Sequence, residues 1–286
     1  MSLLLQQEVG PVIETKPFDF VQHNRRDDKP RSRGITEIRG PYYSVVGTRY
    51  LEDLFEGFGQ YVDSLKFAAG SFSLMPEKAL SAVIELCHAN DVKVSTGGWI
   101  EHVLAGGPQT VDRYLEQCKR LGFDIVELST GFISVPSDDV VRMTEAVQKH
   151  GLLAKPEVGI QFGAGGASSV EALEAEGTND PGRAIDVARK CLDAGAYMVM
   201  IESEGITEQV RAWRTDVVGK IISTLGTEKV MFEAADPAVF AWYVKTYGPE
   251  INLFVDHSQI VQLECLRRGI WGTSDTWGRV LTYRPE

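Results

Sequence analysis

The order of apolar and polar residues after about residue 34 repeats one motif, in which a short β-branched run is followed by an amphipathic segment ending in Gly or Asn. Around 111–121, for example, Val111, Tyr114, Leu115, Cys118 and Leu121 have the spacing of a helix that buries one stripe. The residues that end the predicted helices are Asn90, Gly122, Gly151, Gly195, Gly226, Gly248 and Gly269. The predicted strands are 34–39, 62–67, 92–96, 124–129, 152–158, 197–202, 229–234 and 251–256.

Eight strands in strict alternation with helices predict an α/β fold, a single (β/α)8 TIM barrel over residues 34–286 with an N-terminal extension. The main alternative is an open, doubly wound sheet, which usually carries a glycine-rich phosphate turn after its first strand. Here the first strand is followed by RGPYYSVVG, which contains neither G-x-G-x-x-G nor a P-loop. The pattern therefore favours the barrel.

Two segments stand outside this rhythm. Residues 1–33 are rich in charge and proline, which predicts an N-terminal arm, and the mixed charges of RRDDKPRSR (25–33) favour a solvated segment over a docking patch. The Gly- and Ala-rich residues 163–180 predict a long loop after the fifth strand. In a barrel that loop lies over the catalytic face, as a mobile lid or as a passive insertion.

Composition and charge argue against several classes of partner and location. The 286 residues carry a net charge of -11 and no cluster of Lys and Arg, so we expect no nucleic-acid partner. No apolar run is long enough to span a bilayer and no secretory signal is visible, so we expect a cytoplasmic protein without a membrane partner. The four cysteines form no C-x-x-C pair, which favours reduced structural thiols.

Carboxylates close several of the predicted strands, at the end of a barrel where active sites lie. Glu127, Glu157, Glu202 and Glu233 fall at such positions. A ring of like charges in a low-dielectric mouth raises the pKa of each member, so a cation must offset it. Mg²⁺ bound by one or two of these carboxylates is the predicted cofactor. The alternative is that they pair with Arg39, Lys66 and Lys155 or with rim amides.

Other strand-end residues suit a small anionic substrate. Lys66 can form a Schiff base, donate a proton or hold an anion, or it can make an ordinary salt bridge. Small residues and free amides follow it, including Gly70 and Ser71. The further candidate binding residues are Arg39, Gly97, Gly98, Ser129, Asp256 and His257. For His257 a helix-capping turn is favoured over a chemical role, and Gly97 and Gly98 can equally form a tight turn.

Between residues 34 and 280 the chain contains an ordered set of segments: YVDSLKFAAGSFSLMP, VKVSTGGW, YLEQCKRLGFDIVELSTG, AKPEVG, CLDAGAYMVMIE, VMFEA, INLFVDH and LECLRRG. Together these segments resemble the phosphosulfolactate synthase family. Within the family, TEIRGPYY, STGGW and VDHSQ resemble the eukaryotic branch that includes plant heat-stress-associated proteins. The resemblance implies a TIM barrel, a homo-oligomer, and Mg²⁺-dependent addition of sulfite to C3 of phosphoenolpyruvate on the route to coenzyme M.

The chain departs from that family at two places that matter. The first strand of archaeal members ends in an acidic-basic pair followed by glycine, whereas here it ends in Glu37, Arg39 and Gly40. Archaeal members carry a lysine directly after E-V-G as a favoured general acid, whereas here Ile160 follows. Three alternatives follow from this difference. Lys66 or Lys155 replaces the missing proton donor, with Glu157 as a further catalytic candidate. Otherwise the substrate has changed, or catalysis is lost. The leading hypothesis is a synthase-like lyase. The alternatives are a noncatalytic stress-related or regulatory barrel and a Schiff-base aldolase that uses Lys66.

Overall fold

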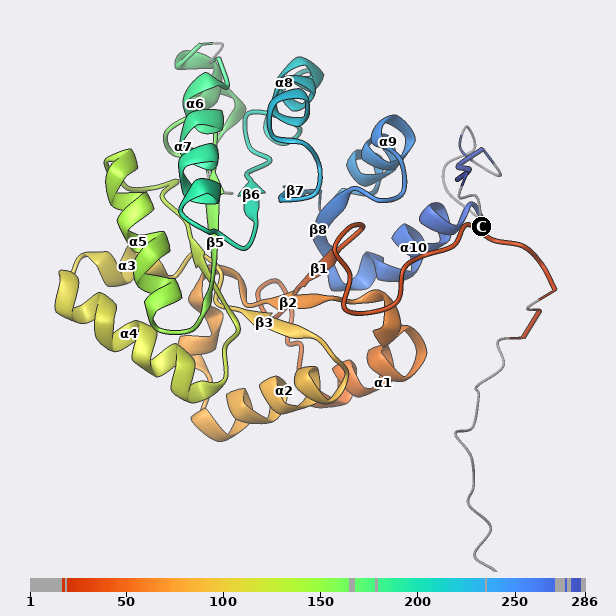
Figure 1. The fold of residues 1–286 in the computed structure, drawn as a ribbon, viewed down its shortest axis with the longest axis horizontal. Helices are drawn as coiled ribbons and strands as arrows, with labels where there is room; N and C mark the ends of the chain where they lie inside the picture. Colours follow the sequence, from red (N-terminus) through yellow and green to blue (C-terminus); the bar gives the residue numbers. More distant parts are fainter. Residues whose placement is uncertain are drawn as a thin grey trace, which may run out of the picture.

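A computed structural model describes residues 17–18, 20–164, 168–177, 180–234, 236–270, 276 and 279–283. Eight parallel strands close a barrel in chain order, and the helices lie outside the ring of strands (Figure 1). Its strands are β1 (Thr36–Arg39), β2 (Ser64–Lys66), β3 (Lys93–Ser95), β4 (Ile125–Leu128), β5 (Leu153–Val158), β6 (Val199–Ile201), β7 (Val230–Glu233) and β8 (Asn252–Asp256). Each lies within its predicted range, which confirms the TIM barrel.

The connections between strands are mainly helical. The α-helices are α1 (Thr48–Phe58), α2 (Glu77–Ala89), α3 (Ile100–Leu104), α4 (Pro108–Leu121), α5 (Ser137–Lys149), α6 (Val170–Ala175), α7 (Gly182–Asp193), α8 (Thr215–Leu225), α9 (Pro237–Tyr247) and α10 (Ile260–Arg268). Short 3-10 turns are η1 (Gly59–Tyr61), η2 (Ala68–Leu74) and η3 (His257–Gln259). The predicted helix ends at Gly122 and Gly269 are confirmed, because both residues adopt left-handed conformations directly after α4 and α10.

Two buried regions support the barrel. The larger packs the outward side chains of the strands against the helices, with Ile38, Leu65 and Val94 fully buried. The smaller lies inside the barrel and consists of Ile35, Met198, Met200, Met231 and Phe254. The residues of this inner cluster precede the polar strand-end residues in sequence on β1, β6, β7 and β8. The apolar part of the interior therefore supports a charged layer nearer the C-terminal ends of the strands.

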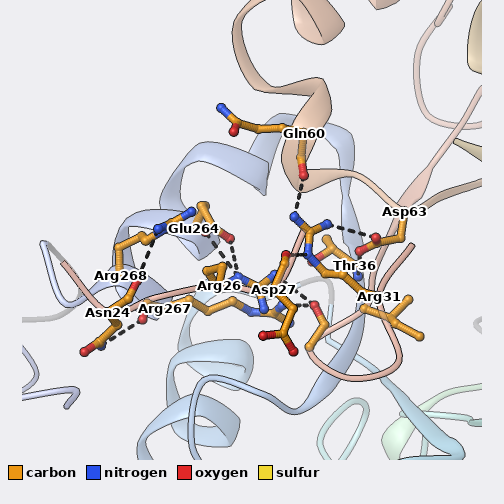
Figure 2. Close-up of polar contacts among 12 residues, drawn as sticks. Asn24, Arg26, Asp27, Arg31, Thr36, Gln60, Asp63, Glu264, Arg267 and Arg268 are labelled. Atoms are coloured by element: carbon orange, nitrogen blue, oxygen red, sulfur yellow. Dashed lines mark hydrogen bonds and ion pairs between the residues drawn. The ribbon is translucent and has the colours of Figure 1, made fainter. Parts of the chain in front are cut away.

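The segment before β1 differs from the solvated arm that the sequence predicts. Arg26 donates to both carboxylate oxygens of Glu264 at 3.2 Å, and Arg31 pairs with Asp63 at 2.9 Å (Figure 2). The two arginine side chains are only 4% and 3% exposed. Local sequence does not reveal these contacts, because the partners lie on α10 and just before β2.

The insertion after β5 is also more ordered than predicted. It contains the short helix α6, whose N-terminus is capped by the Ser169 hydroxyl, which accepts from the Ala172 amide at 3.2 Å. The Gln161 side chain donates to the Leu173 carbonyl at 2.8 Å and joins the start of the insertion to this helix. Residues 165–167 and 178–179 of the predicted lid or insertion lie outside the described residues.

Two expectations from composition can be compared with the structure. Among the described residues, every helix is too short or too polar to cross a bilayer. The four cysteines are free thiols, and Cys87, Cys118 and Cys191 are buried. Burial raises the pKa of the Cys87 and Cys118 thiols to about 12, so both stay protonated near neutral pH.

Candidate active site

The C-terminal ends of the strands surround a cavity of about 230 Å³. In (β/α)8 barrels this is the face that carries active sites. The lining residues are Arg39, Tyr42, Tyr43, Lys66, Ala68, Ala69, Gly98, Trp99, Glu101, His102, Glu127, Ser129, Phe132, Glu157, Glu202, Glu208, Glu233 and Phe254. This cavity, called the mouth of the barrel below, therefore brings together side chains from strands that are far apart in the chain: β1, β2, β4, β5, β7 and β8.

The floor of this mouth is a buried network of alternating charge. Lys155 pairs with Glu37 and lies 3.1 Å from Glu127 Oε2, and the Ser64 hydroxyl donates to Glu37 at 3.0 Å. Lys155, Glu37 and Glu127 are each 1% exposed. Burial alone would raise the pKa of Glu127, but the ammonium groups of Lys66 and Lys155 outweigh it and lower that pKa. Glu127 is therefore ionised and already paired.

Lys66 connects the floor to the open part of the mouth. Its ammonium lies 2.9 Å from Glu127 Oε1 and 3.2 Å from Glu157 Oε2, and 4.4 Å from the centre of the Phe254 ring. Burial opposes its charge, but the surrounding glutamates prevail and raise the pKa of Lys66 well above its ordinary value. A protonated amine cannot attack a carbonyl, so the charge on Lys66 favours anion binding over a Schiff base.

Three carboxylates face one another above this floor. Glu157, Glu202 and Glu233 each offer an oxygen atom, and these atoms lie within 4.8 Å of one another. Burial, with Glu127 next, raises the pKa of Glu157 to about 7. Burial also raises the pKa of Glu202, well above its ordinary value, and that of Glu233. This negative charge is incompletely compensated, and an all-oxygen donor set fits a hard divalent cation such as Mg²⁺.

Cationic and aromatic groups flank the carboxylates. Arg39 Nη2 lies 2.9 Å from Glu233 Oε1. The Arg39 guanidinium also lies 4.9 Å from the ring centre of Tyr43 and 5.1 Å from that of Phe254. Rings on which a guanidinium rests restrict its orientation and stabilise its charge. Arg39 and Lys66 together give the mouth two positive groups that can meet an anionic guest.

A hydroxyl links the carboxylate cluster to α3. Ser129 Oγ lies 2.9 Å from Glu157 Oε1 and 2.6 Å from Glu101 Oε1. Glu101 in turn accepts from the backbone amides of Gly131 and Phe132 at 2.9 and 3.0 Å. A hydroxyl has one proton to donate. Both contacts are satisfied together when one carboxyl carries a proton of its own, which agrees with the raised pKa of Glu157.

The structure separates the four predicted metal ligands into two groups. Glu157, Glu202 and Glu233 come together as one candidate cation site. Glu127 does not join them, because its two oxygens contact Lys66 and Lys155 one layer deeper in the barrel. Here Glu127 is a counter-ion to the two lysines, and its role as a metal ligand stays a prediction. Lys155 is buried in the floor and does not line the cavity, so this geometry gives no support to its predicted catalytic role.

The candidate binding residues also form two groups, those that line the cavity and those that do not. Arg39, Gly98 and Ser129 line the cavity. A Cβ on residue 98 would lie 3.0 Å from Ser129 Cβ, so glycine there leaves room beside the hydroxyl. Ser71, on η2, lies outside the residues that line the cavity.

Gly70 and Gly97 serve the backbone conformation. Both have positive φ, at 71° and 63°. A Cβ at Gly70 would lie 2.0 Å from the Trp99 ring, and one at Gly97 would lie 2.1 Å from the Phe67 carbonyl oxygen. These glycines permit close packing that any side chain would prevent. Neither lines the cavity, and their binding role stays a prediction.

Asp256 and His257 form the turn into η3 and α10. Asp256 accepts from the Ser258 amide at 3.0 Å within a capping box, which confirms the helix-capping interpretation. His257 Nδ1 lies 2.7 Å from the Tyr50 hydroxyl. Neither residue lines the cavity, so the structure does not support the predicted binding role of either.

Several lining residues were not predicted from the sequence. Glu101, Trp99 and His102 belong to α3 and the turn before it, where the Trp99 and His102 rings stack with centres 4.6 Å apart. Tyr42 and Tyr43 follow β1 in the loop that begins with Gly40. Aromatic and acidic residues within five positions of a strand end were the available signal, in GGWIEH and GPYY.

Comparison with known proteins places this site in a family. The family model for (2R)-phospho-3-sulfolactate synthase (ComA) matches residues 24–273. The chain is 42% identical over 258 residues to the protein HEAT-STRESS-ASSOCIATED 32 of Arabidopsis thaliana, covering 87% of this chain and 90% of that protein. It is 27% identical over 270 residues to the phosphosulfolactate synthase of Methanothermobacter thermautotrophicus, covering 92% and 98%.

Solved structures support the fold alone. The carboxyl transferase domain of pyruvate carboxylase from Rhizobium etli aligns with a TM-score of 0.55 at 11% identity. The alignment covers 79% of this chain and 40% of that one, so the chain spans well under half of that structure. The match over residues 24–273 and the relative at 42% identity show that this chain belongs to the (2R)-phospho-3-sulfolactate synthase (ComA) family.

Proposed function

We propose that the chain catalyses a Mg²⁺-dependent addition of sulfite to phosphoenolpyruvate, or a closely related reaction on a small anionic enol or carboxylate. The observation that carries the proposal is the grouping of Glu157, Glu202 and Glu233 beside Lys66 and Arg39 in one cavity. Three carboxylates suit a cation, and the two basic side chains suit an anion held beside it. Family membership supplies the candidate reaction.

In this reaction the sulfur lone pair of sulfite forms a bond to C3 of phosphoenolpyruvate. The electron pair of the C2–C3 double bond moves to C2 and onto the substrate carboxylate, and a proton then adds to C2. A Mg²⁺ ion held by Glu157, Glu202 and Glu233 would stabilise negative charge on substrate oxygens. Lys66 and Arg39 would orient the phosphate and carboxylate groups and offset their charge.

Lys66 is also the proposed proton donor to C2. Of the two lysines that could replace the donor lost at Ile160, Lys66 lines the cavity and Lys155 does not. Its ammonium also contacts Glu127 and Glu157, which keep it charged until substrate binds. Ile160 packs against the hydrophobic core and offers no titratable group. Proton delivery is therefore assigned to the second strand instead of to the segment after β5.

One observation favours a second candidate function. The relative that is 42% identical is named for heat stress, and the relative named as a synthase is 27% identical. Together with Ile160, this favours a noncatalytic barrel that binds a small anion without converting it. The two functions share the cavity and its charges, and they differ in turnover.

Incubation with phosphoenolpyruvate, sulfite and Mg²⁺, followed by phosphorus NMR, tests the proposal. We expect a phosphosulfolactate signal that disappears with a chelator and in the Lys66→Met and Glu157→Gln variants. Lys78→Met, on the exposed face of α2, is the matched control and should retain turnover. Calorimetric binding of phosphoenolpyruvate with Mg²⁺ but no turnover would establish the noncatalytic function. Absence of both would refute the proposal.

We also propose the homo-oligomer that the family resemblance implies. Sedimentation equilibrium of the full chain tests it, and a purely monomeric mass would refute it.

A further inference from the structure

The opposite end of the barrel contains a second cavity with a chemistry of its own. It has a volume of about 420 Å³ and lies near the N-terminal ends of the strands. The arm before β1 contributes Lys29 and Arg31, β3 contributes Lys93, and the start of the sixth βα unit contributes Tyr197. The proposed reaction uses none of these residues.

Two ammonium groups line this cavity without a carboxylate partner among the described residues. Lys29 Nζ donates to the Asn90 carbonyl oxygen at 2.8 Å, which leaves two of its protons for other acceptors. Lys93 lies half-buried on β3 and forms no ion pair within the described part of the chain. Burial, followed by the positive charges of Arg31 and Lys93, lowers the pKa of Lys29.

The nearby acids are mostly committed to other partners. Asp63 pairs with Arg31 at 2.9 Å and accepts from the Thr36 amide at 2.8 Å, as Figure 2 shows around Asp63 and Arg31. Asp124 accepts from the Val94 amide at 2.8 Å and contacts His88 at 2.9 Å. Asp91 is exposed at the rim and raises the pKa of Lys29 without pairing with it.

Burial makes the charge of Lys29 costly. Burial is the largest cause that lowers the pKa of Lys29, from its ordinary 10.5 to about 8. Asp63 and Asp91 offset part of this cost from a distance, and an anion in direct contact with the Lys29 ammonium would offset more of it. The wall also contains Ile35 and Val92 and the ring of Tyr197, which can contact the apolar part of an organic anion.

We infer that this cavity is a binding site for a small dianion of the phosphate or phosphate-ester class, held between Lys29 and Lys93 with His88 at the rim. The inference is independent of the proposed function at the other end of the barrel. Lys29 belongs to the arm before β1 and Lys93 to β3, so a bound anion would also link residues 29–31 to β3. Bare phosphate and a phosphate ester offer the same charged group, and the experiment includes both.

Acetylation of lysines in the full chain, read by peptide mass spectrometry near the Lys29 pKa of about 8, tests the inference. Without added anion, Lys29 should react faster than exposed Lys78, because more of it is neutral. Saturating inorganic phosphate or glycerol 3-phosphate should each slow the reaction at Lys29 and leave Lys78 unchanged. Protection by phosphate alone would assign the site to the free ion, and protection by both would assign it to esters as well.

Variants connect the protection to the second lysine. Lys93→Gln should weaken the phosphate protection of Lys29 about tenfold, the effect of losing one charge-assisted contact. Lys78→Gln should leave it unchanged, and thermal melting should show that both variants are folded. Equal reaction rates at Lys29 with and without both anions in the unmodified chain would overturn the inference, whatever the variants do.

Discussion

Glu157 gives a quantitative test of the carboxylate cluster. Its pKa is raised from an ordinary 4.5 to about 7, first by burial and then by the charge of Glu127. The native state therefore holds this proton more tightly than the unfolded chain does. Stability from this group is complete below about pH 4.5 and is lost as the pH rises to about 7. At about 1.36 kcal/mol for each pKa unit, the loss is about 3 kcal/mol.

The Glu157→Gln substitution removes this titration and keeps the shape of the protonated side chain. At about pH 5 the variant and the parent should unfold with similar free energies. At about pH 8, without divalent metal, the variant should be more stable by up to about 3 kcal/mol. Urea unfolding followed by tryptophan fluorescence measures both. Glu116→Gln, exposed on α4, is the control and should show a constant difference.

Added Mg²⁺ should reverse the order at the higher pH. An ion bound by the carboxylates stabilises the native parent by mass action, and the variant has lost one ligand. A difference between variant and parent that stays flat from about pH 5 to about pH 8 would refute the assignment of a buried, proton-holding Glu157. Equal stabilisation of both proteins by Mg²⁺ would show that the ion binds elsewhere.

Two further predictions concern the arm and the backbone beneath the site. Arg26→Met removes one of the two arginines that pair with the buried Glu264 carboxylate, while Arg268 stays 2.9 Å from it, so urea unfolding should show a loss of about 1.5–3 kcal/mol. Arg33→Met is the control: its arginine is 47% exposed, so the change in stability should be under about 1 kcal/mol. An unchanged midpoint for Arg26→Met would contradict the buried clamp. Gly97→Ala places a Cβ against the Phe67 carbonyl oxygen at a residue with positive φ, so it should lower the melting temperature. Gly57 lies in helix α1 with open space around it, so Gly57→Ala should raise the free energy of unfolding by about 0.5–1 kcal/mol. Equal melting temperatures for the two alanine variants would contradict this account.

The order of elements was readable from the sequence, because it depends on local patterns. Apolar runs and helix stops such as Gly122 and Gly269 report backbone conformation within a few residues. Eight strand–helix repeats then admit few arrangements, and the closed barrel is the one that leaves no strand at an exposed edge. The gathering of Glu157, Glu202 and Glu233 followed from the rule that parallel strands present their C-terminal ends on one face.

The depth of each strand-end residue was decided by the register between strands. Glu127 aligns with Lys155 on the neighbouring strand, and Glu157 lies two residues further along β5. Glu127 is therefore a layer deeper, where two ammonium groups surround it, while Glu157 reaches the mouth. Both glutamates lie on short apolar strands with the same alternation, so the sequence pattern around them does not separate their roles. Register is set by the closure of the whole barrel, so sequence cannot distinguish the counter-ion from the candidate ligand.

The sequence by itself determined the barrel, the face that carries the charged mouth and the family resemblance, because strand period, helix stops and segment order are properties of neighbouring residues. Tertiary structure alone decided that Glu101 reaches Ser129 and that Arg26 and Arg31 are buried. Those contacts join segments far apart in the chain, and their energy comes from burying charges together. No local pattern records which distant partner will complete a buried pair.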